Sequence, residues 1–225
     1  MQTLENRLLE PINTLTHVVG IIASFIGLVI LLPLTRHDPP KMWAMLIYGT
    51  SMILLYTSSS LLHGVKASDT VRFWLNRLDH IAIFLLIAGT YTPIAFTVFA
   101  NPWRNGVLIV VWSVVLVGIG FKLFTRRIHG LLNTSIYVIL GWGSALPLLF
   151  ASQLFTIIPW QGFLFLLLGG LIYSVGFLIY YFHWPDPWPD TFGHHEIWHL
   201  FVLGGSLCHY LFILWYIVPY ERLAA

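Results

Sequence analysis

Charged residues and cysteine are both scarce in this sequence of 225 residues, and each shortage excludes a class of protein. Only 9% of the residues are charged, whereas a water-soluble globular domain carries about a quarter. A single cysteine, Cys208, excludes a secreted module built on disulfide bonds. The formal net charge of +2 provides no basic surface for nucleic acid, and a hydrophobic content of 58% excludes a disordered chain. These exclusions leave an integral membrane protein that crosses the bilayer several times.

Apolar runs of about 20 residues, the length that crosses a bilayer as a helix, are abundant. Cutting the chain at its proline, glycine and charged clusters predicts seven spans, near 14–35, 41–63, 79–99, 104–122, 132–150, 160–182 and 197–218. The connections are too short for a separate soluble domain. A closed barrel would instead show alternating strands, which the sequence lacks. Residues 1–225 are therefore predicted to form a single all-α membrane domain, a bundle of seven transmembrane helices.

Lysine and arginine are unevenly distributed between the two sets of connecting loops. The N-terminal segment and the second and fourth loops together contain more of them than the loops on the opposite side. Because positively charged segments tend to remain in the cytoplasm, we expect a cytoplasmic N-terminus. After seven crossings the C-terminus is then expected outside.

Histidine is frequent, with ten residues. Ionisable side chains at membrane depth are costly and are usually retained for a function. With the predicted order and direction of the spans, several such residues fall at the cytoplasmic ends of spans one, two, three and seven: His17, His63, Asp79, His80, His194, His195 and His199. A single polar site built from these helix ends is therefore geometrically possible.

Two spacings within this set favour a metal site. His195 and His199 stand four residues apart on one helical face, where their imidazoles can bind the same ion. His63, at the matching end of another span, can supply a third nitrogen and leave a fourth position open, as catalytic zinc requires. Asp79 is expected to accept a hydrogen bond from bound water or from a ligand ring, and Ser59, one turn before His63, to support the site. Alternatively, a fourth histidine closes the site and makes the metal structural; the candidates are His17 and His80.

The segment His195-Glu196-Ile197-Trp198-His199 also matches the H-E-x-x-H pattern of zinc metalloproteases, in which the glutamate is the general base. The match covers only five residues, and those proteases take a further ligand downstream. The only acidic residue after His199 is Glu221, on the opposite side of the predicted bundle. A protease site would need His209 or Asp79 to complete it.

Four ordered motifs resemble those of the progestin and adiponectin receptor (PAQR) family and of its short bacterial branch, hemolysin III. They are Glu10-x-x-Asn13-x-x-Thr16-His17, Ser59-x-x-x-His63, Arg77-Leu78-Asp79-His80 with Ala88-Gly89-Thr90-Tyr91-Thr92-Pro93, and Phe192-Gly193-His194-His195-Glu196-Ile197-Trp198-His199 followed by His209. The resemblance implies a seven-helix bundle in a bacterial cytoplasmic membrane. It also implies a zinc ion held by His63, His195 and His199, with Asp79 near the zinc-bound water.

The resemblance also implies a function. Eukaryotic relatives are described as lipid-signalling receptors with ceramidase-like hydrolysis, and bacterial relatives are connected with cytolysis and membrane lipid homeostasis. We therefore expect a zinc-dependent hydrolase of an acyl amide or ester bond in a membrane lipid, with Asp79 orienting the water or taking its proton. The alternative is a non-enzymatic lipid sensor or pore-forming cytolysin with structural zinc, although no span shows the polar stripe that lines a channel. The expected partner is a fatty-acyl lipid and not a nucleic acid.

Overall fold

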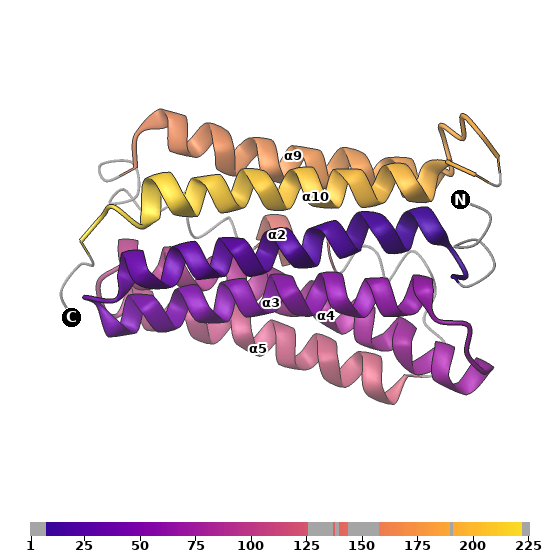
Figure 1. The fold of residues 1–225 in the computed structure, drawn as a ribbon. Helices are drawn as coiled ribbons and strands as arrows, with labels where there is room; N and C mark the ends of the chain where they lie inside the picture. Colours follow the sequence, from indigo (N-terminus) through magenta and orange to yellow (C-terminus); the bar gives the residue numbers. More distant parts are fainter. Residues whose placement is uncertain (1–7, 126–136, 138–139, 144–157, 190, 222–225) are drawn as a thin grey trace.

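Six long helices dominate the computed structural model, which describes residues 8–125, 137, 140–143, 158–189 and 191–221 (Figure 1). The helices are α2 (Pro11–Thr35), α3 (Pro39–Gly64), α4 (Asp69–Val98), α5 (Trp103–Phe124), α9 (Trp160–Phe182) and α10 (His194–Phe212). A π-helical turn, η1 (Ile213–Ile217), continues α10. Each of the six, with η1 counted as part of α10, is long and apolar enough to cross a membrane.

Six of the seven predicted spans coincide with these helices. The remaining one, 132–150, lies mostly outside the described residues, although Tyr137 and residues 140–143 are helical. The largest difference in boundary is at α4, which begins at Asp69 and not at residue 79. The prediction followed the apolar run, whereas the helix begins with polar turns that precede this run. Ser68 precedes α4 in an extended conformation, and Asp69 in the first turn suits the positive end of the helix dipole.

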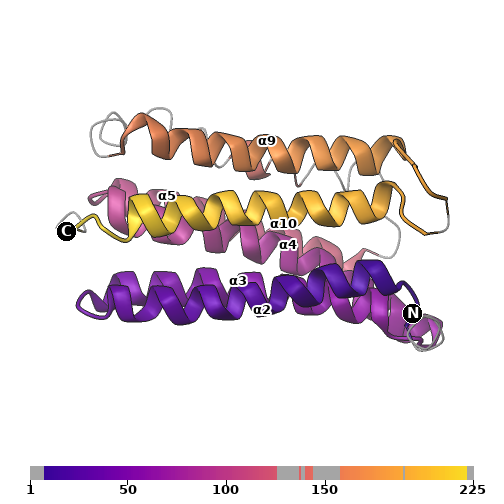
Figure 2. The same ribbon diagram turned by 45° about the horizontal axis from the view of Figure 1, so that its top comes forward.

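Helices α2, α3, α4 and α5 alternate in direction, as do α9 and α10, so the helix ends form two groups at opposite ends of the bundle (Figures 1 and 2). One end carries the N-termini of α2, α4 and α10 together with the C-termini of α3, α5 and α9. In both views α10 lies between α9 and α2, and it packs against both. Helices α5 and α9 run in the same direction, so α5 ends and α9 begins at opposite ends of the bundle.

Glycines allow α2, α3 and α4 to approach closely. A Cβ atom at Gly20 would stand 2.6 Å from the ring of Tyr56, and one at Gly89 would stand 2.2 Å from Ser51 Oγ. Both separations are too short for an ordinary contact, so only glycine fits without a shift of the neighbouring side chain or helix. The apolar core between these helices includes large, fully buried side chains, among them Tyr48, Tyr56 and Phe84. This packing fixes the positions of the helix ends that carry the polar residues.

Candidate metal site

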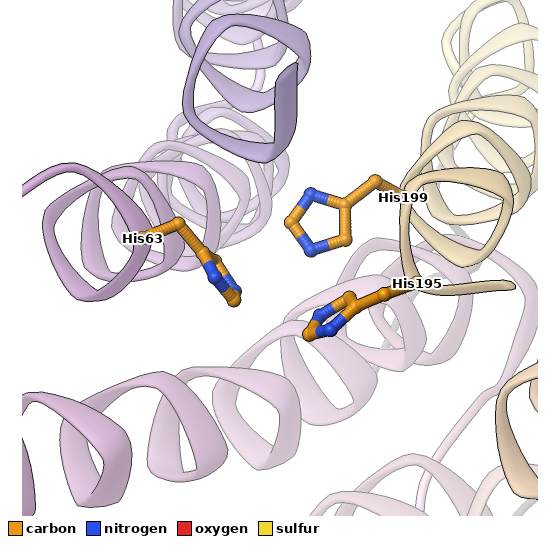
Figure 3. Close-up of side chains that lie close together, drawn as sticks. All are labelled: His63, His195 and His199. Atoms are coloured by element: carbon orange, nitrogen blue, oxygen red, sulfur yellow. The ribbon is translucent and has the colours of Figure 1, made fainter. Parts of the chain in front are cut away.

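Three histidine side chains converge at the end of the bundle where α3 finishes and α10 begins (Figure 3). His63 belongs to the last turn of α3, and His195 and His199 belong to the first two turns of α10. One nitrogen of each ring lies within 4.8 Å of the other two. His63 is only 6% exposed and His199 only 2%, and His195 is half-buried, so the protein shields most of this cluster from solvent.

The three rings pack edge to face. Ring centroids are 4.9 Å apart for His63 and His195, 4.8 Å for His63 and His199, and 5.0 Å for His195 and His199. Tetrahedral zinc, with metal–nitrogen bonds of about 2.0 Å, brings ligand nitrogens to about 3.3 Å from each other. The ligand nitrogens would therefore have to approach one another by at most about 1.5 Å around such an ion, a movement that side-chain rotation can supply.

Hydrogen bonds on the far side of two rings orient them for ligation. His63 Nδ1 donates to Glu10 Oε2 at 2.6 Å, and His199 Nδ1 donates to the main-chain carbonyl of Asn13 at 3.2 Å. These bonds place the ring hydrogen on Nδ1 and leave Nε2 as the lone-pair donor that a metal ion requires. The hydrogen bond with His63, opposed by partial burial, lowers the pKa of Glu10 to about 2 and keeps this carboxylate ionised at neutral pH. The donor set fits a transition-metal ion that prefers imidazole, zinc included.

Asp79 and Ser59 lie beside the histidines. The Asp79 carboxyl group and the Ser59 side chain are hydrogen-bonding partners, and the same carboxyl group interacts electrostatically with His63. Ser59 precedes His63 by one turn on α3, and both side chains are buried. The packing of α3 against α4 therefore brings all three predicted residues together.

His17 touches the site without joining the ligand group. Its ring stacks on the ring of His199, with centroids 3.8 Å apart and an interplanar angle of 17°, and meets Tyr56 edge-on. A stacked ring presents its face, and not a nitrogen lone pair, to its neighbour. Both nitrogens of His17 are buried, and neither has a hydrogen-bond partner within the described part of the chain. His17 thus fixes the plane of a candidate ligand.

Two further histidines considered from the sequence are engaged elsewhere. His80 donates from Nδ1 to the main-chain carbonyl of Asn76 at 2.7 Å. His209 lies 3.2 Å from the main-chain carbonyl of Leu166, which ties α10 to α9. Ten residues separate His209 from His199, or about 15 Å along a helix. Among the described residues, the group able to hold a metal consists of His63, His195 and His199.

Sequence reasoning assigned no role to Asn13, which connects two carboxylates at the site. Its side-chain amide donates to Glu10 Oε2 at 3.0 Å and to Glu196 Oε1 at 2.8 Å. Glu196 Oε2 accepts the backbone N–H of Gly193 at 2.8 Å and so caps the start of α10. The motif containing Glu10 and Asn13 is visible in the sequence, but its contact with Glu196 joins residues 183 positions apart and no local spacing signals it.

The hydrogen bonds of Glu196 argue against the metalloprotease interpretation of the H-E-x-x-H segment. A general base needs a carboxylate oxygen directed at the attacking water. Both oxygens of Glu196 instead accept hydrogen bonds from protein groups. The geometry therefore favours a structural role for this residue.

Together the fold and the site define an integral, multi-pass helical membrane protein with a candidate three-histidine metal site at one end of its bundle. The family model described as "Haemolysin-III related" matches residues 6–210, and the chain belongs to this family. This finding confirms the resemblance drawn from the motifs.

The relatives of this chain include bacterial and animal proteins. The Hemolysin-3 homolog of Bacillus subtilis (strain 168) is 38% identical over 212 residues, which cover 93% of this chain and 94% of the relative. Hemolysin-3 of Bacillus cereus is 37% identical over 212 residues, covering 93% and 92% of the two chains. The Monocyte to macrophage differentiation factor of Homo sapiens is 25% identical over 207 residues, covering 90% and 82%. The similarity therefore extends over nearly the whole chain in each case.

Proposed function

We propose that this protein is a zinc-dependent hydrolase that cleaves an acyl amide or ester bond of a membrane lipid. The observation that carries the proposal is the convergence of His63, His195 and His199 beside a carboxyl group, that of Asp79. Three histidine ligands leave one position of tetrahedral zinc open for water, the arrangement of catalytic and not structural zinc sites. A carboxyl group beside that position can accept and return the proton of the water.

When bound, zinc supplies Lewis acidity toward a carbonyl oxygen and makes water acidic enough to react near neutral pH. Asp79 takes a proton from the attacking water as the water oxygen bonds to the acyl carbon. Asp79 then delivers this proton to the departing nitrogen or oxygen as the acyl bond breaks, which yields a fatty acid and an amine or alcohol. Ser59 keeps the Asp79 carboxyl group oriented through their hydrogen bond.

The position of the site supports a lipid substrate. The histidines belong to helices that are long and apolar enough to cross a membrane, and they lie near the helix ends, where a bilayer meets water. A lipid carries its amide or ester bond at a similar depth, between headgroup and acyl chains. The acyl chain can therefore remain in apolar surroundings while the polar bond reaches the histidines. Such an activity would contribute to membrane lipid homeostasis.

The direct test is release of fatty acid by purified, zinc-loaded protein. Defined ceramides and phospholipids are presented in liposomes, and the free fatty acid is quantified by mass spectrometry. We expect release from at least one lipid class, and its loss in His63→Ala. His209→Ala serves as the control because that side chain interacts with Leu166 on α9. No release from any lipid by protein of verified zinc content would contradict the proposal.

The names of the bacterial relatives favour a second candidate. Two of them are called Hemolysin-3 or its homolog, which suits a lipid sensor or pore-forming cytolysin in which zinc is structural. Liposomes filled with a small dye separate the two candidates in the same assay. Leakage without fatty-acid release favours the cytolysin, whereas fatty-acid release without leakage favours the hydrolase.

A topology of seven spans completes the proposal. Because α5 ends and α9 begins at opposite ends of the bundle, an odd number of crossings between them would fit the described helices. The predicted span 132–150 supplies one such crossing. The distribution of lysine and arginine favours a cytoplasmic N-terminus, with the histidine end facing the cytoplasm and the C-terminus outside. We place this single domain, residues 1–225, in a bacterial inner membrane.

A further inference from the structure

Residues 9–14 form a strap across the histidine end of the bundle, and the proposed hydrolysis assigns this strap no role. Its backbone is fixed to the end of α3: the N–H of Leu9 donates to the carbonyl of Gly64 at 3.3 Å, and the N–H of Glu10 donates to the carbonyl of His63 at 2.9 Å. The strap then enters the first turn of α2. It therefore runs directly past the candidate ligand on α3.

The strap also contacts the ligand helix α10. The main-chain carbonyl of Asn13 accepts from His199 Nδ1, and the side-chain amide of Asn13 donates to Glu196 Oε1. The same amide group donates to Glu10 Oε2, which in turn accepts from His63 Nδ1. One continuous set of hydrogen bonds therefore joins the ligand on α3 to the first turns of α10.

Asn13 is suited to this position because of its two amide hydrogens. The carboxylates on either side can only accept, so the NH₂ group must face both of them. Asn13 is 1% exposed, and its side-chain oxygen is buried without a hydrogen-bond partner among the described residues. An unpaired buried oxygen is destabilising. The two hydrogen bonds to charged groups offset this cost and hold the amide in one orientation.

We propose that Glu10 and Asn13 are positioning residues of the metal site, which orient His63 and His199 and thereby raise the affinity for the ion. A carboxylate on the far nitrogen of a ligand imidazole fixes the ring and makes it a stronger donor. The negative charge of Glu10 also offsets part of the charge of a divalent ion. Asn13 transmits this constraint to the second ligand helix. The inference rests on the metal site of the proposed function and is independent of hydrolysis.

The test measures the zinc dissociation constant of purified full-length protein by competition with a chromophoric chelator. Glu10→Ala is expected to weaken zinc binding about ten- to hundredfold. Glu10→Gln retains an oxygen that can accept from His63 Nδ1 but lacks the charge, so a loss of less than about tenfold is expected. Asn13→Ala is expected to weaken binding as well, since it releases Glu10 and Glu196 from each other. The absorption spectrum of bound Co²⁺ provides a second readout, because it reports the ligand field and not the stability of the fold.

Two matched controls remove the same chemical groups elsewhere. Asp69→Asn removes an exposed carboxylate at the start of α4, and Asn105→Ala removes an exposed amide on α5. Both should bind zinc with wild-type affinity and give the wild-type cobalt spectrum. Size exclusion verifies folding, and if Glu10→Ala does not fold, the isosteric Glu10→Gln decides the result.

The outcomes distinguish this inference from the proposed function. The positioning role would be overturned if Glu10→Gln had the zinc affinity and the cobalt spectrum of the wild type, and if Glu10→Ala, where it folds, had them too. The metal site itself would then remain supported. A wild-type protein that binds no metal would overturn the metal site and both proposals with it. Weakened zinc binding in Glu10→Ala, in a protein whose wild type releases no fatty acid, would support this inference and contradict the hydrolase.

Discussion

At the scale of single residues, Asp79 is the side chain that separates metal binding from catalysis. Its carboxyl group interacts with Ser59 and His63 but is not part of the group of three histidines. We expect Asp79→Asn, which keeps the shape and removes the proton acceptor, to retain zinc and to lose hydrolysis by about 10²–10⁴-fold. Elemental mass spectrometry and fatty-acid release measure the two properties. Hydrolysis at the wild-type rate would exclude Asp79 as the base, and the exposed Asp69→Asn on the same helix is the control.

Glu196, in contrast to Asp79, is expected to support the stability of the fold and not the hydrolysis. Its carboxylate caps α10 through Gly193 and accepts from Asn13. In Glu196→Gln one of these bonds is lost, because an amide cannot accept from Asn13 and Gly193 through both of its terminal atoms. We expect a decrease of about 1 kcal/mol in the free energy of unfolding, with hydrolysis largely retained. Thermal unfolding in detergent and fatty-acid release test this pair of outcomes, and loss of turnover in a zinc-loaded, folded variant would restore the protease-type base.

The histidine cluster could be predicted from the sequence because residue spacing and the order of the spans are enough to bring its members together. Four-residue spacing places His195 and His199 on one face, and the order of spans places His63 at the same end. Glu10 and Asn13 were missed as site residues because their contacts depend on how α2 docks against α3 and α10. A hydrogen bond between residues 183 positions apart leaves no periodic signal in the chain.

At the scale of helices, the crossing of α3 and α4 depends on a glycine without space for a side chain. A Cβ at Gly89 would stand 2.2 Å from Ser51 Oγ and 2.9 Å from Ser51 Cβ, whereas one at Gly120 would meet nothing within 4 Å. We expect Gly89→Ala to lower the free energy of unfolding by about 1–3 kcal/mol, because the two helices must separate. Gly120→Ala is the matched control and should be neutral or stabilising by up to about 1 kcal/mol, since alanine favours a helix. Thermal unfolding of both variants in detergent measures the difference, and equal stabilities would contradict the close crossing.

Apolar length predicted the existence of the described helices but not where α4 begins. Residues 69–78 contain charged and polar side chains, so the search for an apolar run excluded them. In the structure they form the first turns of α4. A helix ends where capping and tertiary contacts end it, and hydrophobicity reports only the part inside the bilayer.

At the scale of the whole molecule, a bound ion would join α3 to α10 and so stabilise the folded state. A ligand that binds only the folded state, at a concentration 100 times its dissociation constant, contributes about 2.7 kcal/mol. We expect a chelator to lower the unfolding temperature of the wild type and to leave that of His63→Ala unchanged. His209→Ala should retain the chelator-dependent shift even if its own unfolding temperature differs. A wild type of verified zinc content that unfolds at the same temperature with and without chelator would contradict this coupling.

The proposed orientation is tested by labelling single cysteines in intact cells. In a Cys208→Ala background, Asp69→Cys places a thiol at the histidine end, and Asn105→Cys places one at the opposite end; both positions are exposed. A membrane-impermeant maleimide should label Asn105→Cys and should label Asp69→Cys only after the cells are opened. The reverse pattern would place the histidine end outside.

The hydrogen bond between Asn13 and Glu196 joins the first described helix to the last, and this has a consequence for the time course of synthesis. While the ribosome is still making the chain, His63 has already emerged, but the segment that bears the other two histidines has not. A nascent chain can therefore insert several helices yet has no complete set of ligands until α10 arrives. Metal occupancy would then mark a chain whose translation and insertion are both finished, and an interrupted chain would remain without metal, with polar groups unpaired at the membrane surface.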